Sequence, residues 1–140
     1  MTVEHIDAVH EIETSSFAFP WSKNQLLEEV TTNKHAIYKV AIIDTVVVGH
    51  AGMWHIINEG HITNIATKTP YRNMGIGSLL VEALIEEAKK LEMIGLTLEV
   101  RTSNIAAQNL YNKYGFKPEG IRKRYYADTG EDAVIMWNYF

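Results

Sequence analysis

The first thirty residues place apolar side chains at helical spacing. From Val3 onward they recur every three or four positions, which predicts a helix over residues 3–15 with one face toward a core. Ser22 and Gln25 then form the S-x-x-Q pattern that begins many helices. We therefore expect two helices joined by a loop over residues 16–21, the second helix starting at Ser22.

The pattern changes to that of strands in the middle of the chain. Residues 36–54 are rich in Val, Ile and Tyr and are interrupted at Asp44 and Thr45, as in an antiparallel hairpin. Residues 61–67 predict a further strand that ends before Pro70.

A glycine-containing segment then leads into the longest apolar stripe. Gly75 and Gly77 precede apolar residues at helical spacing as far as Leu91, which predicts a long amphipathic helix. We expect Gly95 to close that helix region. A strand, a helix and two further strands complete the chain, at residues 96–101, 104–114, 116–125 and 132–139.

The ends of the last predicted helix carry residues that favour helix termini. Asn104 is a good N-cap residue, and Gly115 suits the left-handed conformation that follows many helices. The element order is then α-α-β-β-β-α-β-α-β-β. The sequence predicts one mixed α/β domain over residues 1–140, without a linker or repeat.

Composition narrows the class of protein. The chain has 140 residues and no cysteine, which excludes disulfides, thiolate metal sites and a cysteine nucleophile. It has neither an apolar run long enough to span a membrane nor a signal peptide, so we expect a cytoplasmic protein with no membrane partner. The net charge of -4 argues against direct binding to nucleic acid.

Two groups of polar residues admit alternative interpretations. One basic cluster is either a solvated strand end or a phosphate or substrate contact: Lys117, Arg122, Lys123 and Arg124. The histidines all lie in the first half: His5, His10, His35, His50, His55 and His61. Their spacing is not that of a metal site, so we expect surface or hydrogen-bonded histidines and no metal.

The segment from Arg72 to Ser78 has the features of an anion-binding loop. It follows a predicted strand, contains Gly75 and Gly77, and opens a helix, whose first N–H groups and dipole favour negative charge. A Walker loop would need a Gly-Lys-Ser/Thr sequence, and the dinucleotide motif needs a Gly or Ala where Leu80 stands. A pyrophosphate-containing ligand of another class is the expected occupant, and a plain glycine turn is the alternative.

Glu99 and Tyr111 are the candidate catalytic residues. In the strand over residues 96–101 the even positions are apolar and the odd ones polar, so Glu99 either faces a cleft or pairs with Arg101 near the surface. Tyr111 lies on the apolar side of the last predicted helix, where the alternative is a core tyrosine with its hydroxyl hydrogen-bonded.

Several short motifs together resemble one known family. They are Phe19-Pro20-Trp21-Ser22, Thr63-Asn64-Ile65-Ala66, the Arg72–Ser78 loop, Glu99-Val100-Arg101, Ser103-Asn104, Leu110-Tyr111, Gly115-Phe116, Arg122, Tyr125-Tyr126 and Glu131-Asp132-Ala133. Over residues 3–136 the chain resembles the RimI family of GNAT acetyltransferases. The resemblance implies a mixed, mostly antiparallel central sheet flanked by helices. It also implies transfer of the acetyl group of acetyl-CoA to the N-terminal α-amine, on alanine, of a ribosomal protein.

The same resemblance implies the roles of the site residues. Glu99 matches the family's general base and Tyr111 its general acid. The residues that match acetyl-CoA contacts are Ile65, Ala66, Thr67, Arg72, Asn73, Met74, Gly75, Ile76, Gly77, Ser78 and Asn104. The residues that would border the peptide groove are Trp21, Tyr125 and Tyr126.

A protein α-amine, with a pKa of about 7.7 to 8.0, is partly protonated near neutral pH and must lose a proton before it attacks a thioester. We expect burial to raise the pKa of Glu99 into a range useful for this step. A backbone N–H between Ile65 and Thr67 would stabilise the oxyanion. The absence of cysteine fits direct transfer in a ternary complex.

One departure from the family and two other functions stay open. Family members usually begin with a short strand, whereas this chain opens at Thr2 and Val3 with a helix, so either the start is assigned too late or the edge strand is lacking. We expect a monomer or weak dimer. The alternatives are acetylation of lysine or a small amine, and a non-catalytic acyl-CoA-binding module, against which Glu99 and Tyr111 count.

Overall fold

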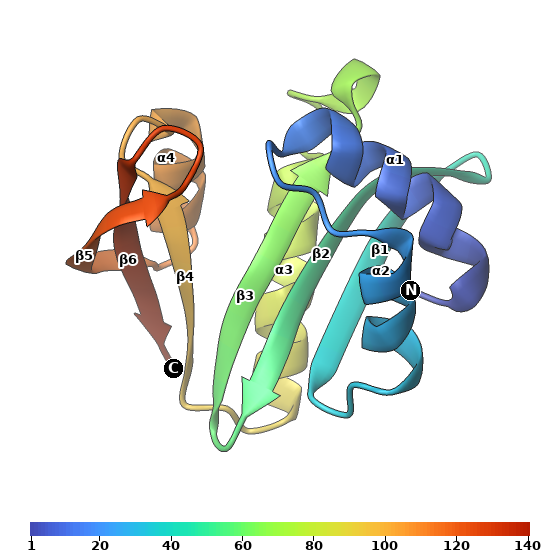
Figure 1. The fold of residues 1–140 in the computed structure, drawn as a ribbon. Helices are drawn as coiled ribbons and strands as arrows, with labels where there is room; N and C mark the ends of the chain where they lie inside the picture. Colours follow the sequence, from blue (N-terminus) through green and yellow to red (C-terminus); the bar gives the residue numbers. More distant parts are fainter.

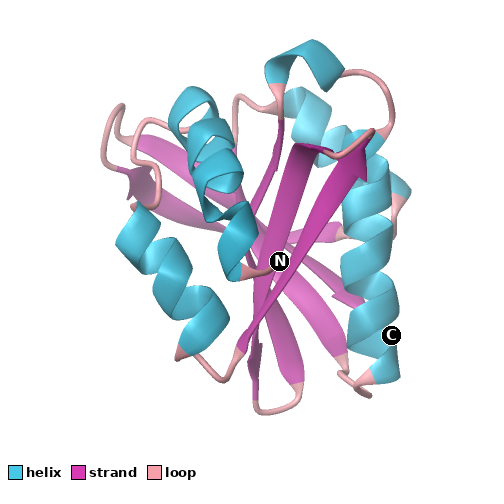
Figure 2. Ribbon diagram, turned by 90° about the vertical axis from the view of Figure 1, so that its right-hand side faces the viewer, coloured by secondary structure: helices cyan, strands magenta, loops and turns pink.

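The computed structural model describes the whole chain, Met1–Phe140, as a six-stranded sheet in the order β1-β2-β3-β4-β6-β5. The strands are β1 (Ala36–Ile43), β2 (Val46–Ile56), β3 (Glu59–Thr67), β4 (Gly95–Arg101), β5 (Lys117–Tyr126) and β6 (Glu131–Tyr139). The helices are α1 (Ile6–Ser16), α2 (Lys23–Thr31), α3 (Ile76–Lys90) and α4 (Ile105–Lys113), with short 3-10 turns η1 (Val3–His5) and η2 (Thr69–Tyr71). Figures 1 and 2 show helices on both faces of the sheet.

The predicted order of elements and the mixed α/β class are confirmed. All strand pairs are antiparallel except β3–β4. Ser22 caps α2 as expected, since its side chain accepts a hydrogen bond from the Gln25 backbone and the Gln25 side chain accepts one in return.

The prediction for Gly95 was wrong. This glycine does not close the preceding helix, because α3 already ends at Lys90 and the chain turns through Glu92, whose φ is +59°. Gly95 instead opens β4, where a side-chain Cβ would lie 2.6 Å from the Asn138 carbonyl oxygen. The neighbouring strand β6 therefore requires glycine at this position.

Two hydrophobic cores hold the helices to the sheet. On one face, α3 packs its apolar stripe, including Val81 and Leu84, against β2 and β4, and Phe116 joins this larger core. On the other face, α1 and α2 bury Val9, Ile12 and Leu26 against β2 and β3. In each of these helices the apolar residues recur at helical spacing and so form one stripe, which is why the sequence predicts the face that packs on the sheet.

The sheet divides between β3 and β4. These strands pair only from Glu59–Gly95 to His61–Thr97, after which they diverge (Figure 1). β3 also has a bulge opposite β2, because Gly52 pairs with Asn64 whereas Met53 pairs with Ile62, which leaves Thr63 as an extra residue. The bulge therefore lies where the two halves of the sheet separate.

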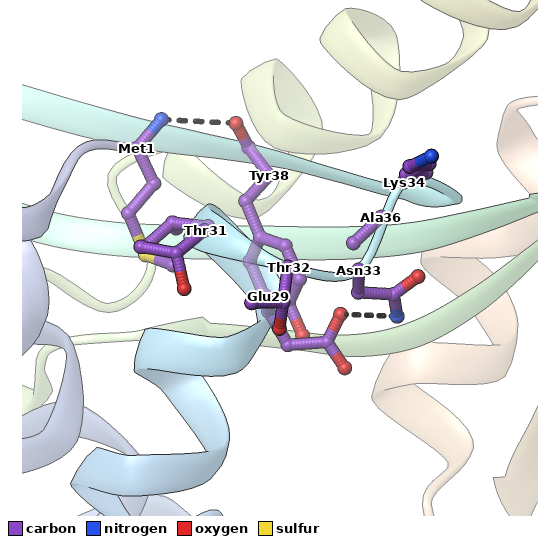
Figure 3. A pocket seen from close by; sticks show the side chains of 9 residues that line it. Met1, Glu29, Thr31, Thr32, Asn33, Lys34, Ala36 and Tyr38 are labelled. Atoms are coloured by element: carbon purple, nitrogen blue, oxygen red, sulfur yellow. Dashed lines mark hydrogen bonds between the residues drawn. The ribbon is translucent and has the colours of Figure 1, made fainter.

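The far edge of the sheet is β1. No strand precedes α1, and the Met1 ammonium group donates a hydrogen bond to the Tyr38 carbonyl oxygen at 3.0 Å. A hollow of about 190 Å³ lies beside this contact, between the end of α2 and β1, and includes Glu29 and Asn33 (Figure 3). It shares no residue with the larger cleft between β3 and β4.

Candidate active site

A cleft of about 640 Å³ opens where β3 and β4 diverge. Its walls come from the α1–α2 loop, β3, β4, α4 and the end of β5. Seven of the predicted site residues line it together: Trp21, Ile65, Glu99, Asn104, Tyr111, Tyr125 and Tyr126. Residues up to 105 positions apart in the chain thus meet at one place, which is the arrangement expected of a binding site.

The strand β4 presents Glu99 to the cleft by simple alternation. Leu98 and Val100 point into the larger core, so the side chain between them points the other way. The pairing of β3 with β4 ends at Thr97, so no strand lies beside β4 on its β3 side at Glu99. Only 9% of its side-chain surface is exposed.

Two basic side chains contact the Glu99 carboxylate. His61 Nε2 lies 2.8 Å from Glu99 Oε2, and Arg122 Nε donates to Glu99 Oε1 at 3.2 Å. The hydrogen bond from His61, together with the charges of His61 and Arg122, keeps the pKa of Glu99 below its usual value. The expectation that burial raises the pKa of Glu99 was therefore wrong, because these partners outweigh desolvation.

The alternative of a Glu99–Arg101 pair is also excluded. Arg101 Nη2 donates to both carboxylate oxygens of Asp128, at 2.9 and 2.8 Å, and Arg101 Nη1 donates to Glu131 Oε1 at 3.3 Å. Its guanidinium group also lies 4.0 Å from the centre of the Tyr126 ring. Arg101 thus contacts the β5–β6 turn and the Tyr126 ring rather than Glu99.

Tyr111 is positioned by both ends of α4. Asn104 caps the helix by accepting a hydrogen bond from Ala107 N, which occupies the side-chain oxygen of this predicted acetyl-CoA contact. At the other end Gly115, with φ +98°, donates to Asn112 O, and Phe116 N donates to Tyr111 O. This is the Schellman arrangement, and it brings the Phe116 ring to 5.8 Å from the Tyr111 ring.

The hydroxyl of Tyr111 keeps its proton at neutral pH. Burial, with a smaller contribution from Tyr126, raises the pKa of Tyr111 to about 12. The ring lines the same cleft as Glu99, so the site offers a carboxylate and a protonated phenol at once. That pair can accept one proton and donate another.

The loop before α3 is suited to an anion. Asn73 and Gly75 adopt left-handed backbone conformations, with φ of +64° and +82°, and no side chain caps the first turn of α3. The first N–H groups of this 15-residue helix are therefore open to a ligand. The exposed loop also contains Met74, beside Gly77 and Ser78 on α3.

Three predicted contacts are restricted by the structure. The side chains of Ala66 and Ile76 are buried in the two cores, so only their backbone groups can reach a ligand. The Arg72 guanidinium group donates to the Thr67 carbonyl oxygen at 3.2 Å and to Ser16 Oγ at 3.4 Å. Arg72 thus joins the loop to the end of β3 and to α1.

The sequence profile of the Acetyltransferase (GNAT) family matches residues 6–116, which include β4 with Glu99, the Arg72–Ser78 loop and Tyr111. The chain belongs to the GNAT family. As a GNAT member it is an acetyl-CoA-dependent N-acetyltransferase, and the open first turn of α3 fits the pyrophosphate of that cosubstrate.

Similar GNAT proteins cover nearly the whole chain. A Bacillus subtilis (strain 168) protein, with a provisionally assigned ribosomal protein bS18-alanine N-acetyltransferase activity, is 46% identical over 137 residues, 98% of this chain and 91% of that one. The Escherichia coli (strain K12) enzyme of that name is 34% identical over 143 residues, 94% of this chain and 88% of its own. A crystal structure of the Escherichia coli ribosomal-protein-S18-alanine N-acetyltransferase superposes with a TM-score of 0.90 at 32% identity, covering 99% of this chain and 90% of that one.

The GNAT site also contains residues that sequence reasoning missed. His61 is hydrogen-bonded, as the histidine prediction allowed, but its partner is Glu99, which was not foreseen. His61 lies at the point where β3 diverges from β4, and the spacing of residues along the chain does not reveal that divergence. Arg122, one residue of the basic cluster, is the second basic side chain that contacts Glu99.

The histidine prediction fails at one position, His50. His50 is completely buried, and neither ring nitrogen has a hydrogen-bond partner. Its Nε2 atom lies 3.6 Å from Glu13 Oε2 on α1. The structure has no group of three or more potential metal-ligating His, Cys, Asp or Glu side chains, and none of its helices is both long and apolar enough to cross a membrane.

Proposed function

We propose that this acetyltransferase acetylates the N-terminal α-amine of a ribosomal protein that begins with alanine. The observation that carries this proposal is the near full-length similarity, at 46% and 34% identity, to proteins whose names specify ribosomal protein bS18-alanine N-acetylation. The open cleft supports it, because an aromatic rim and a carboxylate suit an extended peptide with an amine at its end.

The rim of the cleft would hold the peptide. Trp21 is fixed against Tyr38 and Trp54, with ring centres 6.4 and 6.3 Å away. Across the cleft, Tyr125 and Tyr126 contact each other edge to face at 5.1 Å. Rigid aromatic side chains on both sides offer contact area at a low entropic cost, which favours the first residues of a polypeptide over a small amine.

Glu99 would accept the proton of the attacking amine, directly or through water. Its lowered pKa keeps it ionised at neutral pH, so it is always ready to accept. Although a weakly basic carboxylate removes a proton from a free ammonium group poorly, the nitrogen becomes much more acidic as its bond to the carbonyl carbon forms. His61 and Arg122 would keep the carboxylate oriented during this step.

Tyr111 would act on the other side of the reacting carbon. As the N–C bond forms and the C–S bond breaks, the hydroxyl hydrogen of Tyr111 is donated to the departing sulfur. Backbone N–H groups between Ile65 and Thr67 would stabilise the negative charge on the carbonyl oxygen. The edge of β3 facing β4 has no strand partner beyond His61, which leaves backbone groups available for this role.

The cosubstrate contacts are part of the same proposal. The backbone of Ile65, Ala66 and Thr67, the Arg72–Ser78 loop and Asn104 would bind acetyl-CoA. We further propose a single-domain enzyme that works in the cytoplasm, where ribosomal proteins are made, as a monomer or weak dimer and without nucleic acid or membrane.

The test is coenzyme A thiol release from acetyl-CoA with two matched peptides. One peptide carries the alanine-starting sequence of a ribosomal protein, and the other is its N-terminally blocked copy with all lysines free. We expect release only with the free N-terminus, and mass spectrometry should locate the acetyl group on the α-nitrogen.

Two other outcomes would contradict the proposed substrate. Equal release with both peptides would indicate lysine acetylation, which should also increase steeply with pH because a lysine amine has a pKa near 10.4. No release with either peptide, despite measured binding of acetyl-CoA, would indicate a different amine substrate or a binding module.

A further inference from the structure

Glu13 is a buried carboxyl group that the proposed chemistry does not use. It lies on α1 with its side chain completely buried, and it borders the cleft together with Trp21 and Asn64. Burial of a carboxyl group is unfavourable unless hydrogen bonds compensate for the lost water. Its contacts therefore indicate what it does.

Glu13 is hydrogen-bonded to the bulge of β3. Asn64 Nδ2 donates to Glu13 Oε1 at 3.0 Å, and Thr63 Oγ1 donates to Asn64 Oδ1 at 3.0 Å. The other carboxyl oxygen, Oε2, has no hydrogen-bond partner. Burial raises the pKa of Glu13 to about 7, and His50 Nε2 lies 3.6 Å from Oε2.

The bulge decides which way the following residues point. Ile62 lies in the core on the α3 side, and the extra residue Thr63 then reverses the alternation, so Asn64 faces α1. Ile65 consequently packs toward the α3 side and lines the cleft. The position of the Ile65 backbone thus depends on what holds Asn64.

The neighbouring strand is adapted to Asn64. A Cβ at Gly52 would lie 2.7 Å from Asn64 Oδ1 and 2.4 Å from ring carbons of Tyr38. Asn64 therefore fits beside β2 only because residue 52 is glycine. The amide is enclosed by Gly52, Thr63 and Glu13, which leaves it one orientation.

We propose that Glu13 is a positioning residue for acetyl transfer: through Asn64 it fixes the bulge of β3 and so the backbone at Ile65 beside the reacting groups. This inference rests on the proposed function, because it takes the reaction to occur between β3 and Glu99. It predicts an effect of Glu13 on kcat rather than on substrate affinity.

The experiment compares four variants by kcat, by both KM values and by Tm. Glu13→Ala and Asn64→Ala should each lower kcat roughly tenfold, since small misplacements of reacting groups are costly, while both KM values stay within about twofold. Glu13→Gln should restore kcat to within about twofold of the wild type, because its amide oxygen accepts the same hydrogen bond from Asn64. The Glu13→Ala/Asn64→Ala double variant should be no slower than either single variant.

Glu29 provides the matched control. It is also a buried carboxyl group, on α2, and accepts hydrogen bonds from Trp54 Nε1 and Asn33 Nδ2, but it does not line the cleft. Glu29→Ala should lower Tm and leave kcat unchanged. An equal loss of kcat in Glu29→Ala and Glu13→Ala, or full kcat in Glu13→Ala, would overturn the proposal.

Two further measurements keep the outcome decisive. If Glu13→Ala does not fold, Asn64→Ala removes the same hydrogen bond while Glu13 stays, and full kcat in that variant overturns the inference. The amide NMR resonance of Ile65 should shift in Glu13→Ala and not in Glu29→Ala, a result that needs no substrate. The kcat of each variant is compared with that of the wild type on a peptide that the wild type acetylates. If that peptide does not begin with alanine, the proposed substrate is refuted, but the test of Glu13 still holds.

Discussion

Two carboxyl groups border the cleft, Glu99 largely buried and Glu13 completely buried, and they lie in opposite electrostatic surroundings. On the β4 wall, Glu99 contacts His61 and Arg122, and its pKa is lowered. On the β3 wall, Glu13 has no cationic partner within 3.5 Å, and burial raises its pKa to about 7. Burial and polar partners act in opposite directions on a carboxyl group, and their balance decides whether it is charged.

This difference separates chemistry from geometry. The β4 wall, with Glu99 and Tyr111, supplies the groups that exchange protons. The β3 wall, with Glu13, Asn64 and the α1–α2 loop, supplies fixed positions for the substrates. His50 fits the second description, because desolvation lowers its pKa to about 4 and so keeps the ring neutral beside Glu13.

The largest expected effect comes from removing the charge of the β4 wall. Glu99→Gln keeps the shape of the side chain but cannot accept a proton, so kcat should fall by about 10²- to 10⁴-fold. The measurement is thiol release with the free-amine peptide. Full turnover of this variant would mean that Glu99 is not the base.

Tyr111→Phe should have the next largest effect. The phenyl ring keeps the contact with Phe116 but cannot donate to the departing sulfur, so we expect kcat to fall by roughly 10- to 100-fold. Circular dichroism should show an unchanged fold. If kcat stayed the same while KM for acetyl-CoA rose, Tyr111 would be a binding residue and not an acid.

A change on the loop of the β3 wall should act on affinity instead. Phe19 lines the cleft and is 69% exposed, so Phe19→Ala can remove substrate contact with little effect on folding. Loss of one aromatic contact should raise KM for the peptide about 2- to 10-fold and leave kcat unchanged. Phe140→Ala, at an exposed position outside the cleft, is the control and should change neither constant.

The smallest expected effect is a pH-dependent difference in stability. The pKa of His61 is raised above its usual 6.5, mainly by its hydrogen bond to Glu99, so its stabilising contribution is fully present below pH 6.5 and is lost as pH rises through the raised value. The contribution of Glu99 is present above its usual 4.5 and is lost as pH falls through its lowered value. In urea unfolding, the loss of unfolding free energy caused by His61→Gln should therefore be larger at pH 6 than at pH 9. A loss of unfolding free energy that does not change with pH, or an equal loss in the control variant His35→Gln at an exposed position, would exclude an ion pair between His61 and Glu99.

Much of the fold could be predicted because its signals are local. Ser22 with Gln25 caps α2, and Asn104 with Gly115 bounds α4, through contacts within a few residues. Gly95 was misinterpreted because the reason for glycine there is the backbone of β6, more than forty positions away. The roles of Glu99 and Tyr111 came from the family resemblance and stay predictions, although the structure brings both to one cleft.

By itself the sequence determined the order of the elements, the apolar faces that pack them and the acetyltransferase family, since each depends on the type and spacing of residues along the chain. The tertiary structure alone decided where β3 leaves β4, that Thr63 is a bulge, and that His61 and Arg122 meet at Glu99 while Glu13 meets Asn64. These contacts join residues 23 to 51 positions apart. A pKa depends on the charges and water around a group in space, and folding is what brings those neighbours together.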